Sequence, residues 1–357
     1  MDQVTVIADC AVATVDAHGT EYDRGYVVVR GNRIDAVGAG DAPELDPDAR
    51  RVDGHGCLLT PGLVNTHHHL YQWITRGLAT DHTLFEWLTT LYPAWAGIDE
   101  DGVRVAATGA LAALARTGCT TTTDHHYVFP RDGGDPLAAE IAAAAQVGLR
   151  FHPCRGSMDL GVSAGGLPPD HLVERLDDIL AASAEAVARW HDPSFDAMVR
   201  IALAPCSPFS VTPELLRESA ALARATGVRL HTHLAETVDE QDYCAATFGC
   251  TPAQYLERLG WFGPDVWYAH AVHLDDGAID ALARTGTGVA HCPTSNARLG
   301  AGVAPPAPQR RVPLGSLGAS VVHPRHDGHG ARRRNHPPVA VDGRGVGGPL
   351  VAPGGHG

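Results

Sequence analysis

The sequence predicts a TIM-like (β/α)8 barrel preceded by a small β-sandwich part. Three observations indicate this fold. Short apolar strands separated by Gly, Asp and Asn turns fill residues 1–57, and strands alternate with helical stretches from residue 58 onward. Polar clusters rich in histidine follow the predicted strands repeatedly. Because barrel enzymes place their chemistry at the carboxyl ends of the strands, these clusters favour a barrel over an open sheet.

The first 57 residues are predicted to be all-β. Strands are expected at 4–7, 26–29 and 33–37, where β-branched residues dominate. Gly31-Asn32 lies between the second and third strands and is typical of a hairpin turn. These strands make up the expected sandwich part.

Residues 58–303 are predicted to form the barrel. The apolar run at 58–64 is expected to be its first, buried strand. Further strands are expected at 118–126, 149–153, 197–204, 228–234, 266–272 and 288–292. Helical spacing of apolar residues predicts helices at 99–116, 138–147, 172–189, 213–226, 252–259 and 276–284. Seven strands are counted, so the barrel lacks its eighth strand.

The character of the sequence changes after about residue 304. Residues 304–357 contain seven arginines, two acidic residues, Asp327 and Asp342, and no aromatic residue, and they are rich in Pro, Gly and His. Such a segment cannot bury enough apolar surface to fold by itself. We therefore expect a disordered or poorly packed tail, and the abrupt change is also typical of a shifted reading frame.

Composition excludes several classes of function. The chain has 357 residues, is 44% hydrophobic and carries a net charge of −14, so it can bury a large core and is a poor partner for nucleic acid. Membrane spans and signal peptides are not expected from its apolar runs or its first residues. The eight scattered cysteines predict reduced thiols in a cytoplasmic protein. A homo-oligomer is compatible with these features.

The first histidine cluster follows the strand predicted at 58–64. Side chains alternate along a strand, so His67 and His69 are expected to face the same way and to share a metal ion, while His68 faces away. Imidazole nitrogen suits zinc and iron. The alternative is a histidine-rich loop without a metal, since the chain has 21 histidines.

Further clusters favour the metal site over the loop. His231 and His233 end another predicted strand and lie on one face, and Glu236 follows three residues later. His270 and the 291–296 segment, which begins with histidine, stand at the ends of two more predicted strands. Two pairs of histidines on separate strands, one followed by a glutamate, are an improbable coincidence.

These motifs resemble the amidohydrolase superfamily and, within it, the zinc deaminases of purines and triazines. The resemblance lies in PGLVNTHHH at 61–69, HTHLAE at 231–236, AHAVH at 269–273 and AHCPTSN at 290–296. It is strongest to members that act on 8-oxoguanine, through HHHLYQ at 67–72, WLTTLYPAW at 87–95, DHHYVFP at 124–130, RGSM at 155–158 and APCSPFS at 204–210. It spans residues 1 to about 303.

The resemblance implies a role for individual residues. The metal ligands are His67, His69 and His233, the proton shuttle is Glu236, the residue that orients the attacking water is His270, and the substrate contacts are Gln72 and Arg155. The neighbouring His68, His125, His126 and His231 are expected to support the structure rather than to bind the metal.

The implied activity is metal-dependent hydrolytic deamination of an amino-substituted heterocycle, with zinc, or alternatively iron, as the cofactor. A metal-bound water has a lowered pKa, and a glutamate can accept its proton and return it to the leaving ammonia. The expected substrate is 8-oxoguanine, giving urate. Guanine, a hydroxytriazine or a related azaaromatic is the alternative substrate, and a truncated, non-catalytic product is the alternative of another class.

The sequence departs from the family at the eighth strand. Members of the family supply there an Asp, in a context like GVDG, that binds the metal and the water. It is expected near Val321-Val322, and no Asp stands at that place. Asp327 and Asp342 are the candidate replacements. We therefore expect residues 1–357 to be unstable and nearly inactive.

Overall fold

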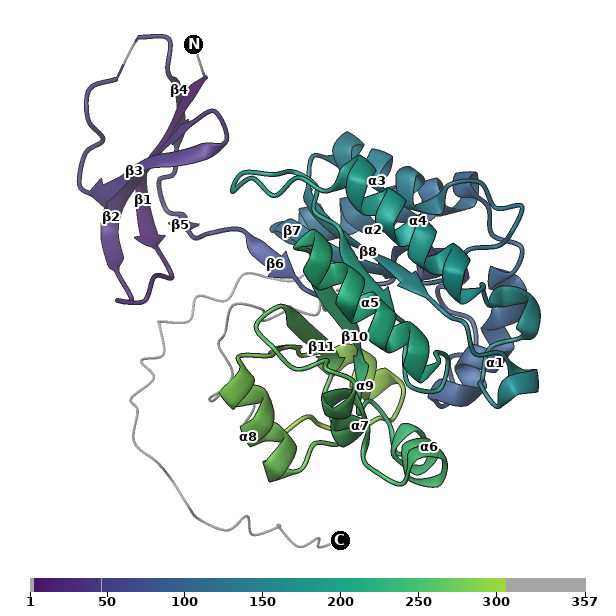
Figure 1. Ribbon diagram of the computed structural model, residues 1–357. Helices are drawn as coiled ribbons and strands as arrows, with labels where there is room; N and C mark the ends of the chain where they lie inside the picture. Colours follow the sequence, from purple (N-terminus) through teal and green to yellow (C-terminus); the bar gives the residue numbers. More distant parts are fainter. Residues whose placement is uncertain (1–2, 46, 306–357) are drawn as a thin grey trace, which may run out of the picture. The chain divides into compact units, whose positions relative to one another are not determined.

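The computed structural model describes residues 3–45 and 47–305. These residues form a five-stranded sheet followed by a seven-stranded parallel sheet with its helices (Figure 1). The predictions that concern the tail, including those for Asp327 and Asp342, lie outside the described residues.

The N-terminal sheet contains the three strands that the sequence predicts. Its members are β1 (Val4–Ala13), β2 (Glu21–Arg30), β3 (Arg33–Ala39), β4 (Arg50–Asp53) and β5 (Leu58–Leu59). Strands β1, β2 and β3 pair in antiparallel hairpins, and β4 and β5 pair in parallel with β1. The expected hairpin turn joins β2 to β3 at Gly31-Asn32, with Gly31 at φ 60°. At the place of the predicted sandwich part the structure thus has one separate sheet, with its own small core around Cys10 and Val27.

The apolar run at 58–64 is two strands, which corrects the prediction of one buried strand. Leu58–Leu59 pairs with β1, whereas β6 (Leu63–Asn65) is the first strand of the other sheet and pairs with the next strand of that sheet, which begins at Cys119. Leu63 and Val64 are 46% and 42% exposed. Within the described residues β6 has a sheet neighbour on one side alone, which leaves these side chains partly uncovered.

The second sheet holds seven parallel strands in sequence order, as predicted for the barrel. After β6 they are β7 (Cys119–His126), β8 (Arg150–Ser157), β9 (Ala202–Pro205), β10 (Arg229–Leu234), β11 (Val266–His270) and β12 (Gly288–Ala290). In the part of the chain that the structure describes, β6 and β12 are the two edges of this sheet. All carboxyl ends of its strands therefore lie on one side.

The helices connect these strands and pack against them. They are α1 (Leu84–Trp95), α2 (Glu100–Arg116), α3 (Pro136–Val147), α4 (Leu176–Trp190), α5 (Pro213–Thr226), α6 (Val238–Phe248), α7 (Pro252–Arg258), α8 (Asp276–Thr285) and α9 (Pro293–Arg298). The predicted ends of α3 and α5 at Gly148 and Gly227 are confirmed, since both glycines adopt left-handed φ values of 86° and 74°. No helix of the described residues is both long and apolar enough to cross a membrane.

Helices α1, α6 and the short α9 were not predicted as helices. An internal proline, Pro93, interrupts the sequence signal of α1, which begins with a capping box between Thr83 and Glu86. In α6 the buried residues are Glu240 and Cys244, so its apolar period is too weak to detect.

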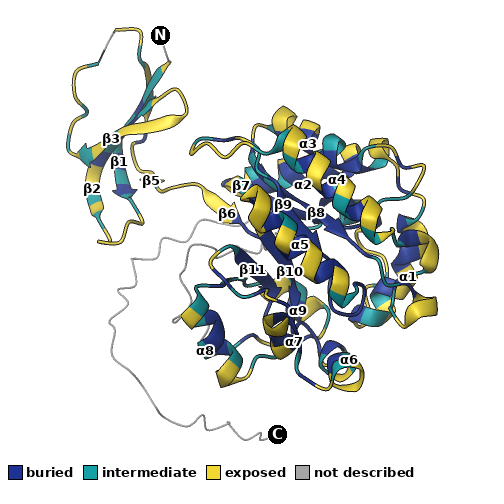
Figure 2. Cartoon of the chain, viewed as in Figure 1, coloured by how far each residue is buried: buried dark blue, intermediate teal, exposed yellow. Residues whose placement is uncertain are grey.

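The core lies between the helices and the seven-stranded sheet. Each helix buries one face and exposes the other, while β10 and β11 are buried along nearly their whole length (Figure 2). Large side chains such as Phe151, Trp261 and Tyr268 fill this core. The ends of the central strands are therefore held on a densely packed scaffold.

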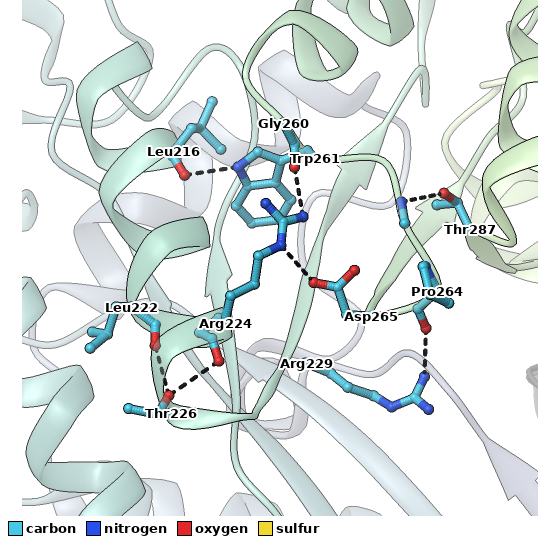
Figure 3. Close-up of polar contacts among 12 residues, drawn as sticks. Leu216, Leu222, Arg224, Thr226, Arg229, Gly260, Trp261, Pro264, Asp265 and Thr287 are labelled. Carbon is cyan, nitrogen blue, oxygen red and sulfur yellow. Dashed lines mark hydrogen bonds and ion pairs between the residues drawn. The ribbon is translucent and has the colours of Figure 1, made fainter.

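A network of polar contacts fixes the beginnings of β10 and β11 (Figure 3). Arg224 Nε donates to Asp265 Oδ2 at 3.0 Å, and the indole Nε1 of buried Trp261 donates to the carbonyl of Leu216 at 2.8 Å. Asp265 immediately precedes β11. This network stabilises the amino ends of the strands, opposite to the ends where the histidine clusters lie.

Candidate metal centre

The predicted metal ligands meet at the carboxyl ends of the strands. His67 and His69 follow β6, and His233 lies near the end of β10. The ring centroid of His67 is 4.7 Å from that of His69 and 5.0 Å from that of His233. Residues 164 positions apart in the chain are thus brought together, as the two histidine pairs predict.

The ring nitrogens of His69 and His233 are arranged as in a metal site. Each ring uses Nδ1 to donate to a backbone carbonyl, His69 to His125 and His233 to Cys206, both at 2.7 Å. Their Nε2 atoms therefore carry lone pairs, and these two atoms are 3.2 Å apart. Two buried lone pairs at this distance repel each other unless a positive charge lies between them, so the pair fits a cation.

His67 supplies a third nitrogen. Its Nδ1 lies 2.8 Å from Nε2 of His231, and its Nε2 is buried without a hydrogen-bond partner among the described residues. A buried polar atom normally has a partner. Three imidazole Nε2 atoms whose Nδ1 atoms are all engaged fit a borderline divalent metal ion such as zinc.

The electrostatics of the site keep these rings neutral. Burial, followed by the neighbouring histidines, holds the pKa of His67 and of His69 well below the usual value. Burial also lowers the pKa of His233 to about 4. At neutral pH the three rings are neutral, with one protonated nitrogen each, which is the form that binds a metal through the other nitrogen.

Glu236 and His270 lie beside the three ligands. Glu236 Oε1 is 3.4 Å from His270 Nε2, and both side chains are almost fully buried. The Nδ1 of His270 is 2.8 Å from Asn296 Oδ1, so Nδ1 donates and Nε2 faces the glutamate. Burial raises the pKa of Glu236 to about 7. A carboxyl group with such a pKa can both accept and donate a proton.

The chain takes an unusual backbone conformation at these strand ends. Ala235 and His270 have φ values of 50° and 72°, in the left-handed region that non-glycine residues rarely adopt. Both backbone N–H groups of Ala235 and Glu236 donate to the two carboxylate oxygens of Glu240, each at 2.8 Å. Glu240 thereby holds the turn that places Glu236.

Sequence reasoning missed the roles of Glu240 and Asn296. Glu240 lies four residues after Glu236, in the first turn of α6, a helix that was not predicted. Asn296 belongs to the AHCPTSN motif, but the motif does not reveal which residue it contacts.

The two predicted substrate contacts lie in different surroundings. Gln72 Nε2 donates to the hydroxyl of Tyr127 at 3.1 Å, and the Tyr127 ring is 5.3 Å from that of His69. Arg155 pairs with Glu174 at 2.6 Å and lies over the ring of Phe129. Arg155 also lines a cavity of about 670 Å³ formed with residues of α3 and α4. Gln72 is thus connected to the histidine cluster through Tyr127.

Two further histidines, His125 and His126, lie at the end of β7. The ring of His125 is 4.8 Å from that of His233, and its nitrogen lies in the same group of donor atoms as His67, His69 and His233. His125 Nε2 is engaged by the carbonyl of Ala204 at 2.9 Å.

His126 instead faces α3. Its Nδ1 is 2.9 Å from Glu140 Oε1, and its Nε2 is 2.8 Å from the carbonyl of Val128. Together with Asp124, these two residues, His126 and Glu140, form a buried group of two carboxyls and one imidazole.

Comparisons with known proteins agree with this geometry. Residues 58–309 match the Amidohydrolase family. The chain is 46% identical over 298 residues to 8-oxoguanine deaminase from Pseudomonas aeruginosa, covering 82% of the chain and 66% of that protein. It is 41% identical over 312 residues to isoxanthopterin deaminase from an unknown prokaryotic organism, covering 84% and 64% respectively. The chain thus spans just under two thirds of the length of these curated relatives.

A solved structure shows the same fold. Atrazine chlorohydrolase from Arthrobacter aurescens, complexed with zinc, superimposes with a TM-score of 0.80 at 33% sequence identity. The match covers 84% of this chain and 68% of the other. A zinc-complexed relative with this fold is consistent with the arrangement of the three imidazoles.

Proposed function

Since the chain belongs to the amidohydrolase family, we propose that its site performs metal-dependent hydrolytic deamination of an amino-substituted heterocycle. The observation that supports this proposal most is the meeting of three neutral imidazole Nε2 atoms with a buried Glu236–His270 pair. The histidines offer a metal site, and the pair offers a group that can move a proton beside it.

The residues divide the reaction between them. A divalent ion held by His67, His69 and His233 would lower the pKa of water and so supply hydroxide near neutral pH. Glu236 takes the proton of the attacking water and gives it to the amino nitrogen as ammonia leaves. The water oxygen bonds to the ring carbon first, and the carbon–nitrogen bond then breaks as the amino group leaves with this proton. His270, oriented by Asn296, positions the water against the carboxyl group.

The proposed metal is zinc, with iron as the alternative. Imidazole ligands are compatible with both. The zinc complex of a relative with the same fold supports zinc.

The proposed substrate is 8-oxoguanine, which would give urate and ammonia. The 46% identical relative that is named for this substrate supports the choice. Guanine and hydroxytriazines are the alternatives, since a 39% identical relative from a Pseudomonas species is a hydroxydechloroatrazine ethylaminohydrolase. Gln72 and Arg155 are proposed to contact the heterocycle.

We also propose that the protein is cytoplasmic. All eight cysteines are free thiols, and seven of them are buried. This usage is typical of a reducing compartment.

The decisive test compares two proteins. One is the chain itself, and the other joins residues 1–304 to the C-terminal segment of the Pseudomonas aeruginosa relative. Ammonia release is measured with 8-oxoguanine, guanine and a hydroxytriazine. We expect the chimera to prefer 8-oxoguanine and the chain itself to turn over slowly. A folded, metal-loaded chimera that releases ammonia from none of the three substrates would overturn the proposal.

A further inference from the structure

We propose that His231 is a positioning residue that keeps the proton of His67 on Nδ1 and so keeps His67 Nε2 available to the metal. The inference rests on the metal centre of the proposed function and extends it to a residue outside the ligand set. It follows from the chain of hydrogen bonds behind His67.

The direction of each hydrogen bond in this chain is determined by its last acceptor. His231 Nδ1 is 2.8 Å from the carbonyl of Trp267, and a carbonyl accepts, so His231 Nδ1 bears the proton. In the neutral ring His231 Nε2 is then an acceptor. Since it lies 2.8 Å from His67 Nδ1, that nitrogen must donate. The lone pair of His67 is left on Nε2.

Packing holds His231 in this role. Its ring is fully buried and stacks on the indole of Trp267, with centroids 4.4 Å apart and planes at 13°. The indole Nε1 donates to the carbonyl of Thr66 at 3.0 Å, directly before His67. Trp267 therefore fixes both His231 and the backbone that presents His67.

His67 differs from the other two ligands in its acceptor. His69 and His233 donate to backbone carbonyls, which no side-chain substitution removes. His67 donates to a side chain. Its proton position therefore depends on residue 231, and this dependence can be tested by mutation.

Loss of the acceptor has a definite consequence. A buried His67 Nδ1–H without a partner is unfavourable, and the ring can escape by moving its proton to Nε2. A protonated Nε2 cannot bind a metal. The hydrogen-bond acceptor behind a metal-binding histidine typically contributes about tenfold to a hundredfold to metal affinity.

The test uses the matched variants His231→Gln and His231→Met in the full chain. The glutamine oxygen is as many bonds from Cβ as Nε2 of histidine and can accept the proton of His67, whereas methionine fills a similar volume with a poor acceptor. Zn²⁺ and Co²⁺ affinities are measured by competition with a chromophoric chelator, together with the Co²⁺ absorption spectrum. We expect about a tenfold to hundredfold weaker binding in His231→Met and recovery of most of it in His231→Gln.

Two controls separate the explanations. Trp261→Phe removes a buried hydrogen bond at the opposite ends of the strands and should lower the melting temperature without changing metal affinity. His67→Ala should lose the metal, and if it does not, the metal centre of the proposed function is wrong. If His67→Ala loses the metal while His231→Met binds it as tightly as the wild type, the inference about His231 alone is wrong.

A measurement on the wild type does not depend on the variants folding. Imidazole ¹⁵N NMR of the metal-free chain should show the His67 proton on Nδ1. A proton on Nε2 would overturn the inference.

Discussion

At the scale of single residues, the site depends on which atom of each side chain is left free. His69 and His233 each commit Nδ1 to a backbone carbonyl, so their Nε2 atoms face each other at 3.2 Å. His270 commits Nδ1 to Asn296 and turns Nε2 toward Glu236. Specific hydrogen bonds, rather than residue type alone, thus favour the proposed ligand and proton-transfer roles.

Glu236→Gln should retain the metal and lose turnover, because an amide cannot accept the proton of the attacking water. General acid–base catalysis typically contributes about a hundred- to ten-thousandfold, so kcat of the chimera should fall by that factor. Steady-state ammonia release and metal content check the prediction. The exposed Glu218→Gln on α5 is the charge-matched control. Turnover near the wild-type rate in Glu236→Gln would mean that another base operates.

At the scale of secondary-structure elements, helices supply buried carboxyl groups that hold the strand ends. Glu240 of α6 accepts both N–H groups of the turn after β10. Glu140 of α3 contacts His126 at the end of β7, and Asp124 of the same strand accepts the N–H of Leu70 at 2.5 Å. These contacts hold backbone segments that lie next to the proposed metal ligands in sequence.

In the buried group of Asp124, His126 and Glu140, the carboxyl groups are protonated and therefore neutral. His126 Nε2 donates to the carbonyl of Val128, so in the neutral ring Nδ1 is an acceptor and Glu140 must donate to it. Consistently, burial raises the pKa of Glu140 to about 8, and burial, followed by the charge of Glu140, raises that of Asp124 well above its usual value.

Glu140→Gln should therefore remove a pH-dependent loss of stability. The pKa of Glu140 is higher in the folded chain than in the unfolded chain. Its contribution to the free energy of unfolding is therefore fully present below about pH 4.5 and is lost as the pH rises toward about 8. The amide keeps a donor for His126 at every pH. The free energy of unfolding of wild type relative to Glu140→Gln should fall between pH 5 and 8, by about 1.4 kcal/mol per pH unit at most.

Denaturant unfolding at several pH values checks this prediction. The exposed Glu185→Gln on α4 is the matched control and should show no pH-dependent difference from the wild type. A constant difference between wild type and Glu140→Gln across the range would show that Glu140 is ionised in the folded chain.

At the scale of the whole molecule, the site joins distant parts of the seven-stranded sheet. His69 follows β6, an edge strand within the described residues, whereas His233 lies on β10, an interior strand of the same sheet. The two histidines are 164 residues apart in sequence. A bound metal would therefore link the beginning of the parallel sheet to its middle.

Metal removal should lower the melting temperature of the full chain. Ligand that binds the folded state alone stabilises it by about 2.7 kcal/mol at a hundred times Kd, and the unfolded chain does not hold the three imidazoles together. Thermal melts with a chelator and with added Zn²⁺ check this. His67→Ala should abolish the shift, while the exposed His18→Ala should keep it. Equal shifts in both variants would place the metal elsewhere.

The sequence by itself determined the parallel strand–helix alternation and the histidine pairs at the strand ends. Apolar periodicity is local, and it predicted six of the seven strands of the second sheet, part of the remaining strand β6, and the glycine ends of α3 and α5. The family resemblance implied that His67, His69 and His233 share a metal, and parallel strands that end on one side of their sheet allow these residues to meet.

Only the tertiary structure decided how these residues are used. The division of residues 58–64 between two sheets depends on which strands are neighbours, and apolar composition does not contain that information. The roles of Glu240, Asn296 and His231 arise from hydrogen bonds between atoms of different elements. Such contacts depend on angstrom-scale geometry set by packing of the whole core, which local sequence patterns do not specify.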